Sequence, residues 1–166
     1  MAPLTLRRAG AEDDFAGILA LVQACFAYME ERIDPPSSMH RLTVESVRAH
    51  GLTEEIWLAE DEAGALAACV FFTVKRDGTG TPGRLYLGKM AVRPDCRGSG
   101  IARRMIEKAS ERAVALDLPL LELEARIELV ENHRTFARFG FVKTAEKAHP
   151  GYDRPTSITM QRPAAA

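Results

Sequence analysis

The residues with the clearest chemical meaning form a glycine-rich turn between an expected strand and an expected helix. The turn reads Arg97-Gly98-Ser99-Gly100-Ile101-Ala102 and follows a strand that Pro94 ends. Amides at the start of a helix lack carbonyl partners within it, and the helix dipole adds positive potential there. Glycines let a bound group approach the backbone closely. The turn therefore predicts an anion site, most naturally for phosphate.

Two common phosphate-binding patterns do not fit the chain. The glycine-rich segment 78–83 continues with Arg84 and Leu85, where a Walker loop needs Lys and then Ser or Thr. A dinucleotide fingerprint, GxGxxG, needs glycine at the position that Arg103 occupies. The pattern that remains is Arg-x-x-Gly-x-Ala, which begins at Arg97.

The elements that position this turn follow from hydrophobic periodicity. It predicts helices over 11–28, 39–50, 98–116 and 131–139 and strands over 4–8, 55–60, 65–75, 84–92, 118–125, 141–144 and 157–161. Glu12, Asp13 and Asp14 are expected in the first turn of the first helix. The segment 84–125 is expected to be a β-α-β unit of parallel strands, and the strands before it connect as hairpins. We expect one α/β domain over 1–166, a mixed, largely antiparallel sheet with helices on both faces.

Composition excludes several classes of protein. The 166 residues carry a formal net charge of −1, so no concentrated basic surface for nucleic acid is expected. The three cysteines form no Cys-x-x-Cys pair, and the four histidines show no ligand spacing, so no metal is expected. No apolar run is long enough for a signal peptide or a membrane span, which predicts a cytoplasmic protein.

Three motifs in order resemble the GNAT superfamily of acetyl-CoA-dependent N-acetyltransferases. KMAVRP at 89–94 and the Arg97–Ala102 turn match the strand end and pyrophosphate motif of that family. LELEA at 121–125 matches its next strand, and FARFGF at 136–141 matches its following short helix. The resemblance covers about residues 84–142, and the half of the chain before it agrees only in element order.

The resemblance implies a site for acetyl-CoA as the cosubstrate. The amides of Arg97 to Ala102 would cradle the pyrophosphate, and the strand around Met90 would pair with pantetheine. A bulge in this strand would turn the Met90 amide toward the thioester carbonyl. Arg93, Arg103, Arg104 and Lys108 would help neutralise phosphates, or they form a solvated helix face. The residues expected at the cofactor are Met90, Ala91, Val92, Arg97, Gly98, Ser99, Gly100, Ile101, Ala102, Asn132 and Phe136.

The resemblance also implies direct transfer to a primary amine in a ternary complex, with no covalent enzyme intermediate. Glu124 matches the general base of the ribosomal-protein acetyltransferases in this superfamily; alternatively it pairs with Arg126. Glu122, on the same strand face, is a weaker candidate. Tyr86 could hold a water or simply pack against a helix.

Two positions depart from the family pattern. Phe136 stands where many members have the tyrosine that protonates the leaving thiolate. Either Tyr152 or water would then supply this proton, or the thiolate would leave without protonation. Leu129 stands where the family often has the asparagine that contacts pantetheine, and Asn132 is the expected replacement or else a helix cap.

The acceptor is left open by the sequence, with a small molecule and a peptide both compatible. Tyr28, Glu30, Glu31 and Arg32, together with the loop 77–83, are candidates for the acceptor pocket or ordinary solvated residues. A homodimer is expected by analogy with the superfamily. The alternative function is a catalytically silent acyl-CoA-binding module, which the loss of tyrosine at Phe136 keeps open, whereas the acids Glu122 and Glu124 favour the enzyme.

Overall fold

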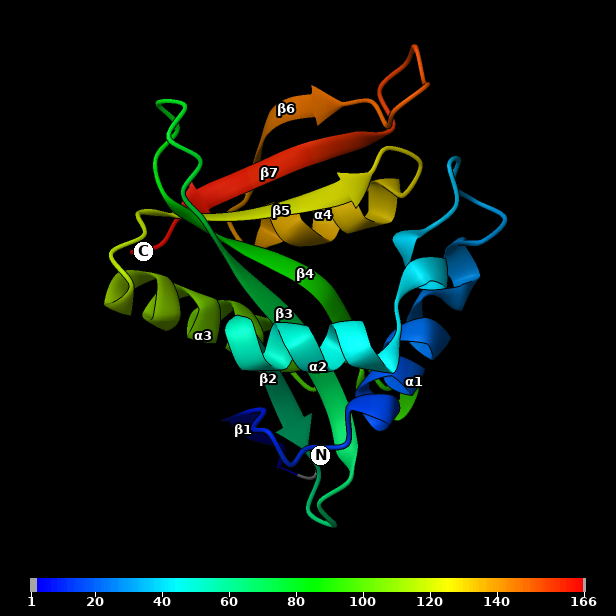
Figure 1. Cartoon of the computed structure of the whole chain (residues 1–166), viewed down its shortest axis with the longest axis vertical. Coiled ribbons are helices and arrows are strands. Elements are labelled where there is room, and N and C mark those ends of the chain that lie inside the picture. The colour runs from blue at the N-terminus through cyan, green and yellow to red at the C-terminus, as the bar shows by residue number, and fades with distance from the viewer. Residues whose placement is uncertain (1–2, 166) are drawn as a thin grey trace.

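A computed structural model describes residues 3–165, whose elements are labelled in Figure 1. The strands in this range are β1 (Thr5–Arg8), β2 (Glu55–Glu60), β3 (Leu66–Lys75), β4 (Arg84–Val92), β5 (Leu120–Arg126), β6 (Val142–Lys147) and β7 (Ser157–Pro163). The α-helices are α1 (Phe15–Phe26), α2 (Val44–Thr53), α3 (Ile101–Ala115) and α4 (Val130–Arg138). Short 3₁₀ turns occur at Ala27–Met29, Ser38–Arg41 and Pro94–Cys96.

The strands form one sheet in the order β1-β2-β3-β4-β5-β7-β6. Neighbouring strands are antiparallel except β4 and β5, which are parallel and are connected by α3. The predicted β-α-β unit and the mixed, largely antiparallel α/β fold are therefore confirmed. A parallel pair needs a crossover of this kind because a tight turn cannot join its ends.

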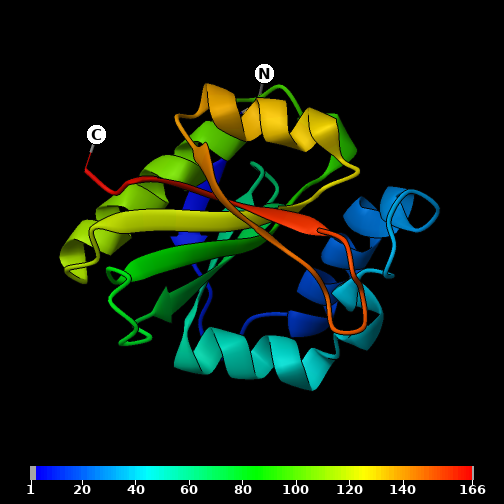
Figure 2. The ribbon, with the colours of Figure 1, turned by 90° about the horizontal axis from the view of Figure 1, so that it is seen from above.

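Helices cover both faces of the sheet, as Figure 2 shows from above. The helices α3 and α4 lie on one side and α1 and α2 on the other. The α3 side is packed by Met105, Ile106 and Ala109 against strand residues such as Leu85 and Leu121. A second core joins α1 and α2 to the opposite face of β2 and β3. As its amphipathic pattern predicts, α3 buries its apolar face against the sheet and exposes its charged face to solvent.

Two helices begin later than their sequence pattern predicts, for different physical reasons. The first helix begins at Phe15, and Asp14 is its N-cap, whose carboxylate accepts a hydrogen bond of 3.0 Å from the Gly17 amide. The acids that precede it therefore lie outside the first turn. The long helix begins at Ile101 because Gly98 and Gly100 have φ of +79° and +82°, outside the helical region.

The second predicted helix is displaced toward the C-terminus. A helix expected over 39–50 is instead α2, which runs from Val44 to Thr53 and includes Gly51. Thr43 and Ser46 form a capping box, with the Thr43 hydroxyl accepting from the Ser46 amide at 3.1 Å and the Ser46 hydroxyl accepting from the Thr43 amide at 3.0 Å. The shift leaves residues 34–42 as a connection that is free to form the wall of a cavity.

Glu122 is a buried structural residue, and the prediction that it is an alternative catalytic base is not supported by its surroundings. Only 3% of the residue is exposed. Its carboxylate accepts hydrogen bonds of 2.8 Å from Arg84 Nε and 2.8 Å from Gln161 Nε2, and Lys75 Nζ lies 3.6 Å away. These contacts join β3, β4, β5 and β7 where β4 and β5 pair.

Truncating Glu122 should destabilise the fold strongly. Glu122→Ala removes the buried partner of Arg84 Nε and leaves the guanidinium paired with Asp77 alone. Breaking a buried ion pair typically costs about 3–5 kcal/mol of unfolding free energy. Urea denaturation would measure the loss. As a control, Glu111→Ala removes an exposed partner of Lys108 and should cost less than about 1 kcal/mol. Equal losses in the two variants would contradict this account.

His50 at the end of α2 is half-buried against β3. Its Nε2 donates a hydrogen bond of 3.0 Å to the Phe72 carbonyl, and its ring lies 5.0 Å from the Phe71 ring. Burial lowers the pKa of His50 below its ordinary value of 6.5. The folded chain therefore favours the neutral imidazole.

The free energy of unfolding should fall as the pH is lowered through the ordinary histidine range. Because the pKa of His50 is lower in the folded chain, the unfolded chain takes up the proton first, and stability is lost as the pH falls below the ordinary pKa of 6.5 toward the lower pKa of the folded chain. Thermal unfolding of His50→Gln should show a shallower decline than the wild type. His40→Gln, a change at an exposed position, should keep the wild-type slope. A His50→Gln slope equal to the wild type would contradict the assignment.

Candidate active site

The site begins where β4 and β5 part. Their parallel pairing covers Arg84–Tyr86 against Leu120–Glu122 and then stops. Beyond that point β4 remains paired with β3 on its other side, as far as Val92. The rest of β4 therefore offers one backbone edge to a ligand, as an edge strand does.

A β-bulge lies on this open part of β4. Ala91 pairs with Cys69 and Gly88 with Phe71, so Lys89 and Met90 both stand opposite the single residue Val70. Lys89 has φ of +52°, and burial lowers the pKa of its amine. A bulge re-aims the backbone groups beside it. The bulge expected at Met90 is thus present, and its role toward a thioester stays a prediction.

A cavity of about 250 Å³ fills the space between the parted strands. Its β4 wall includes Tyr86 and Met90, and its β5 wall includes Glu124 and Arg126. Asn132 and Phe136 of α4 and Tyr28 of the first 3₁₀ turn close it. The side-chain amide of Asn132 donates a hydrogen bond of 3.5 Å to the Tyr28 hydroxyl. The Phe136 ring stands edge-on to the Phe141 ring, with 6.1 Å between the ring centroids. We call this the donor cavity.

The glycine-rich turn lies at the α3 end of the same strand. The Arg104 amide donates to the Gly100 carbonyl at 3.2 Å, so the amides of residues 101–103 precede the first bond of the helix. Space around Gly98 and Gly100 is open: apart from their chain neighbours, no heavy atom lies within 4 Å of the point that a Cβ would occupy. The Ser99 hydroxyl is buried and has no partner within residues 3–165. These features fit an anion close to the backbone.

The basic side chains around the turn are mostly occupied by the protein itself. Arg93 pairs with Asp61 at 3.0 Å and with Asp95 at 2.6 Å. The Arg104 guanidinium donates to the Leu4 carbonyl at 2.7 Å. Arg103 stacks over Phe139, and Lys108 lies over Trp57 and pairs with Glu111. The backbone is therefore a better candidate for holding phosphates than these side chains.

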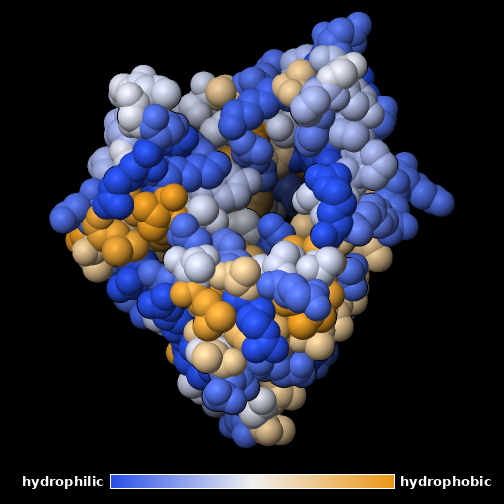
Figure 3. Space-filling view, in the orientation of Figure 1, coloured by the Kyte–Doolittle hydropathy of each residue, from blue (hydrophilic) through white to orange (hydrophobic). Residues whose placement is uncertain are grey.

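A larger cavity of about 570 Å³ lies on the other side of Tyr86 and Glu124. Figure 3 shows it as a hollow with hydrophilic walls between the strands and the α1–α2 connection. The connection supplies residues 35–38 together with His40 and Arg41, and the β6–β7 loop supplies His149, Pro150 and Tyr152. Tyr86 and residues 124–126 line both cavities. We call the larger one the acceptor cavity.

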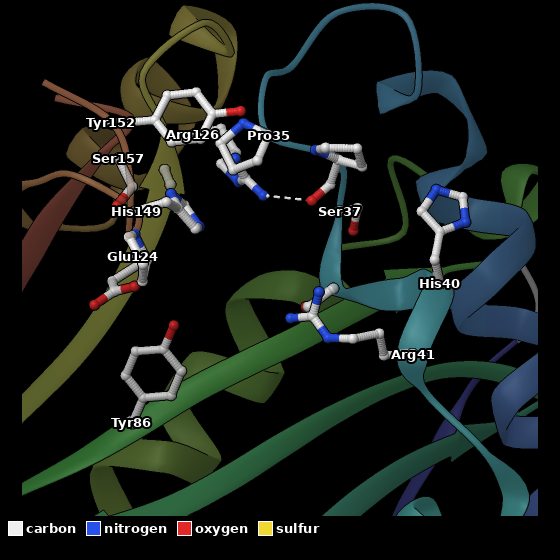
Figure 4. A pocket seen from close by; sticks show the side chains of 14 residues that line it. Pro35, Ser37, His40, Arg41, Tyr86, Glu124, Arg126, His149, Tyr152 and Ser157 are labelled. Atoms are coloured by element: carbon white, nitrogen blue, oxygen red, sulfur yellow. Dashed lines mark hydrogen bonds between the residues drawn. The ribbon is translucent and has the colours of Figure 1, made fainter. Parts of the chain in front are cut away.

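Glu124 and Tyr86 line both cavities, and Figure 4 shows them side by side on one wall of the larger one. Glu124 is paired with Lys147 of β6 at 2.7 Å, and not with Arg126, the partner considered as the alternative to a catalytic role. Burial raises the pKa of the Tyr86 phenol, and Lys75 Nζ lies 3.9 Å from its ring centroid. Tyr86 therefore keeps its proton and can donate a hydrogen bond, while the partly exposed Glu124 can accept one.

Tyr152 lines the acceptor cavity, but its hydroxyl is directed to a different partner. It donates to the Asp34 carboxylate at 2.5 Å, which raises the pKa of the phenol. Arg154 also reaches Asp34, at 3.2 Å. These contacts join the β6–β7 loop to the α1–α2 connection across the mouth of the cavity.

The loop residues considered for the acceptor pocket divide between other places. Tyr28 lies in the donor cavity, while Glu30 and Arg32 face His40 and Glu131 in exposed contacts of 3.5 and 2.6 Å. In the loop 77–83, Asp77 pairs with Arg84 at 2.7 Å. None of these charges lines the acceptor cavity within the described residues.

The sequence did not predict that Arg41 and His149 line a cavity, and it indicated Arg126 only as a partner of Glu124. The Nδ1 of His149 contacts the Thr156 hydroxyl, and burial, followed by the nearby Arg126 charge, lowers the pKa of the imidazole. The segment HPGYDRP that carries His149 was the available signal, because histidine between a strand and a Pro-Gly turn has no obvious packing role. Arg41 carried no such signal.

Other kinds of site find little support in residues 3–165. This range contains no cluster of three or more His, Cys, Asp or Glu that could hold a metal. Its three cysteines are free and buried, so Cys96 beside the turn is poorly placed for a nucleophile. Within the same range, no helix has the length and apolar character to cross a bilayer.

Comparison with known proteins identifies the family. The model of the acetyltransferase (GNAT) family matches residues 17–141, well over half of the chain. The chain therefore belongs to the GNAT family of acetyltransferases, whose fold binds acetyl-CoA. A search among curated proteins finds no significant match.

Solved structures agree with the fold. A GNAT acetyltransferase from Listeria monocytogenes is 19% identical with a TM-score of 0.75, covering 96% of this chain and 94% of that one. The yncA protein of Salmonella typhimurium, solved with acetyl-CoA, is 17% identical with a TM-score of 0.70, covering 99% and 96%. A NatC complex bound to Gag peptide and CoA is 17% identical with a TM-score of 0.67, covering 96% and 98%. At these identities the likeness establishes the fold alone.

Proposed function

We propose that the protein is an N-acetyltransferase that moves an acetyl group directly from acetyl-CoA to a primary amine. The observation that carries this proposal is the meeting of two cavities at Tyr86 and Glu124. One cavity lies between the parted strands, and the other opens toward the α1–α2 connection. Two substrates that enter from opposite sides would meet there, and alignment of this kind supplies much of the rate enhancement in a two-substrate transfer.

Acetyl-CoA would occupy the donor side. The amides of residues 97–102 would hold the pyrophosphate, and the open edge of β4 from Met90 to Val92 would pair with the pantetheine arm. The Met90 amide beside the bulge would donate to the thioester oxygen, where negative charge develops in the transition state. Asn132 and Phe136 would flank the arm from α4.

The amine would attack from the acceptor side. Its nitrogen forms a bond to the carbonyl carbon, the carbon–sulfur bond breaks, and the products are an amide and free CoA. Glu124 would take the proton of the amine, directly or through water. The Lys147 ammonium, 2.7 Å from this carboxylate, would have to release it during proton transfer.

Phe136 has no hydroxyl group and cannot protonate the leaving thiolate. Tyr28 lies in the same cavity, hydrogen-bonded to Asn132, and we propose it as the donor of the compensating proton in place of Tyr152. A thiol of ordinary pKa near 8.5 is also a tolerable leaving group without assistance.

A catalytically silent acyl-CoA-binding module is the second candidate. Two observations favour it: the phenyl ring of Phe136 cannot donate a proton, and Glu124 is already engaged by Lys147 at 2.7 Å. Such a module would bind acetyl-CoA through the same turn and strand edge and release no thiol with any amine.

Replacing Gly100 should weaken CoA binding. Gly100→Ala puts a methyl group into the open space beside the backbone, and we expect the Kd for CoA to rise at least about tenfold. Gly64→Ala is a matched control, because Gly64 has the same φ of +82° and open surroundings in the β2–β3 turn. Calorimetry should find its Kd unchanged. A Gly100→Ala variant that binds CoA normally would contradict the phosphate site.

Replacing the proposed base should slow turnover without affecting CoA binding. Glu124→Gln should lower kcat about 100-fold or more, measured as thiol released from acetyl-CoA with a panel of primary amines. The control is Glu146→Gln, a β6 carboxylate that pairs with Lys143 and lines neither cavity. Unchanged turnover in Glu124→Gln would refute its role, and no turnover in the wild type with any amine would favour the silent module.

A further inference from the structure

The charges that face the acceptor cavity are mostly positive. Arg41 and Arg126 reach it from different walls, with Glu124 and Tyr86 on a third side (Figure 4). The Glu124 charge is balanced by Lys147 at 2.7 Å. The Arg41 side chain has no hydrogen bond or ion pair within residues 3–165 and is exposed. Among the side chains that line the cavity, the positive charges therefore outnumber the negative ones next to the site where the amine must react.

Arg126 is held in place but incompletely paired. Its Nη2 donates to the Pro36 carbonyl at 3.0 Å, while its Nη1 is buried with no partner among the described residues. Of the nearby carboxylates, Asp34 accepts from Tyr152 and Arg154, while Glu128 accepts from the Asp34 amide at 3.1 Å through Oε2 only, and neither forms an ion pair with Arg126. A half-buried guanidinium on a cavity wall, with no carboxylate paired to it, favours an anion beside it, because a guanidinium presents paired donors to a carboxylate.

The spacing of Glu124 and Arg126 suits a ligand with two functional groups. The two residues are separated by one position on β5, so they share a face about 7 Å apart along the strand. Each would contact its own group of the ligand. An amine directed to Glu124 and an acid directed to Arg126 can then be joined by a single carbon atom.

We propose that the acceptor is an α-amino acid, whose carboxylate is bound by Arg126 together with Arg41. This inference rests on the proposed acetyl transfer and specifies its substrate class. A polyamine would bring a second positive charge toward Arg41 and is disfavoured. A peptide N-terminus has an uncharged amide where the carboxylate is required, so it is disfavoured as well.

Matched acceptors test the proposal. Amino acids of several side-chain classes would be compared with their carboxamides and their decarboxylated amines, with thiol release from acetyl-CoA as the readout. We expect kcat/KM to be at least about tenfold higher for one or more amino acids than for the neutral counterparts. Equal or better turnover of the carboxamides or amines would overturn the carboxylate assignment while leaving acetyl transfer intact. A preference for 1-aminoalkylphosphonates would also overturn it.

Variants of the two arginines identify the binding group. Arg126→Gln and Arg41→Gln should each lower kcat/KM for the preferred amino acid about 10- to 100-fold and change that of its decarboxylated amine less than about threefold. The Arg41 guanidinium pairs with no other described group, so its variant should fold normally even if Arg126→Gln does not. Arg154→Gln removes the same charge near the cavity without lining it and should keep the preference. Loss of the preference in Arg154→Gln alone would refute the assignment.

A binding measurement separates this inference from the proposed reaction. Calorimetry in the presence of CoA would compare the binding of N-acetyl amino acids with that of their N-acetyl carboxamides. This measurement needs no turnover. Tighter binding of the acid that disappears in Arg41→Gln supports the carboxylate site even if no amine releases thiol, in which case the reaction alone is refuted. Equal binding of acid and amide overturns the carboxylate site.

Discussion

The structure depends on a pair of parallel strands that stop pairing halfway along their length. Buried backbone N–H and C=O groups need partners, so a sheet that opens in its middle carries an energetic cost. In this protein β4 is paired with β3 on one side, while its other side has no strand partner after Tyr86. Glu122, with its partners Arg84 and Gln161, lies at the end where β4 and β5 still pair, and the bulge at Lys89 and Met90 lies where the two strands have parted. The unpaired edge makes the middle of the sheet a place where an extended ligand can bind.

The parts of this arrangement built from local pattern could be predicted from the sequence. Alternating and helical periodicity located every strand and α-helix, and the glycines at 98 and 100 indicated a turn with unusual backbone angles. Boundaries were less certain where capping decides them, as Asp14 and Thr43 show. Glu122 and Glu124 look equivalent in the sequence, yet one is buried in an ion cluster and the other lines two cavities.

The acceptor side could not be predicted, because contacts between distant segments create it. Asp34 and Tyr152 are 118 positions apart, and nothing in either segment indicates the other. Lys147 likewise became the partner of Glu124 only through the register of β6 and β7. The roles of the individual site residues, the single-domain organisation, the homodimer and the cytoplasmic location stay predictions.

The bridge between the α1–α2 connection and the β6–β7 loop has a consequence for how this fold can change over time. The turn, the open strand and α4 all lie within residues 17–141, whereas one wall of the acceptor cavity, at residues 149–157, lies beyond them. Loops tolerate substitution and length change better than the elements that they join. Descendants of this chain could therefore acquire new acceptors by altering two surface loops while the donor side is inherited unaltered.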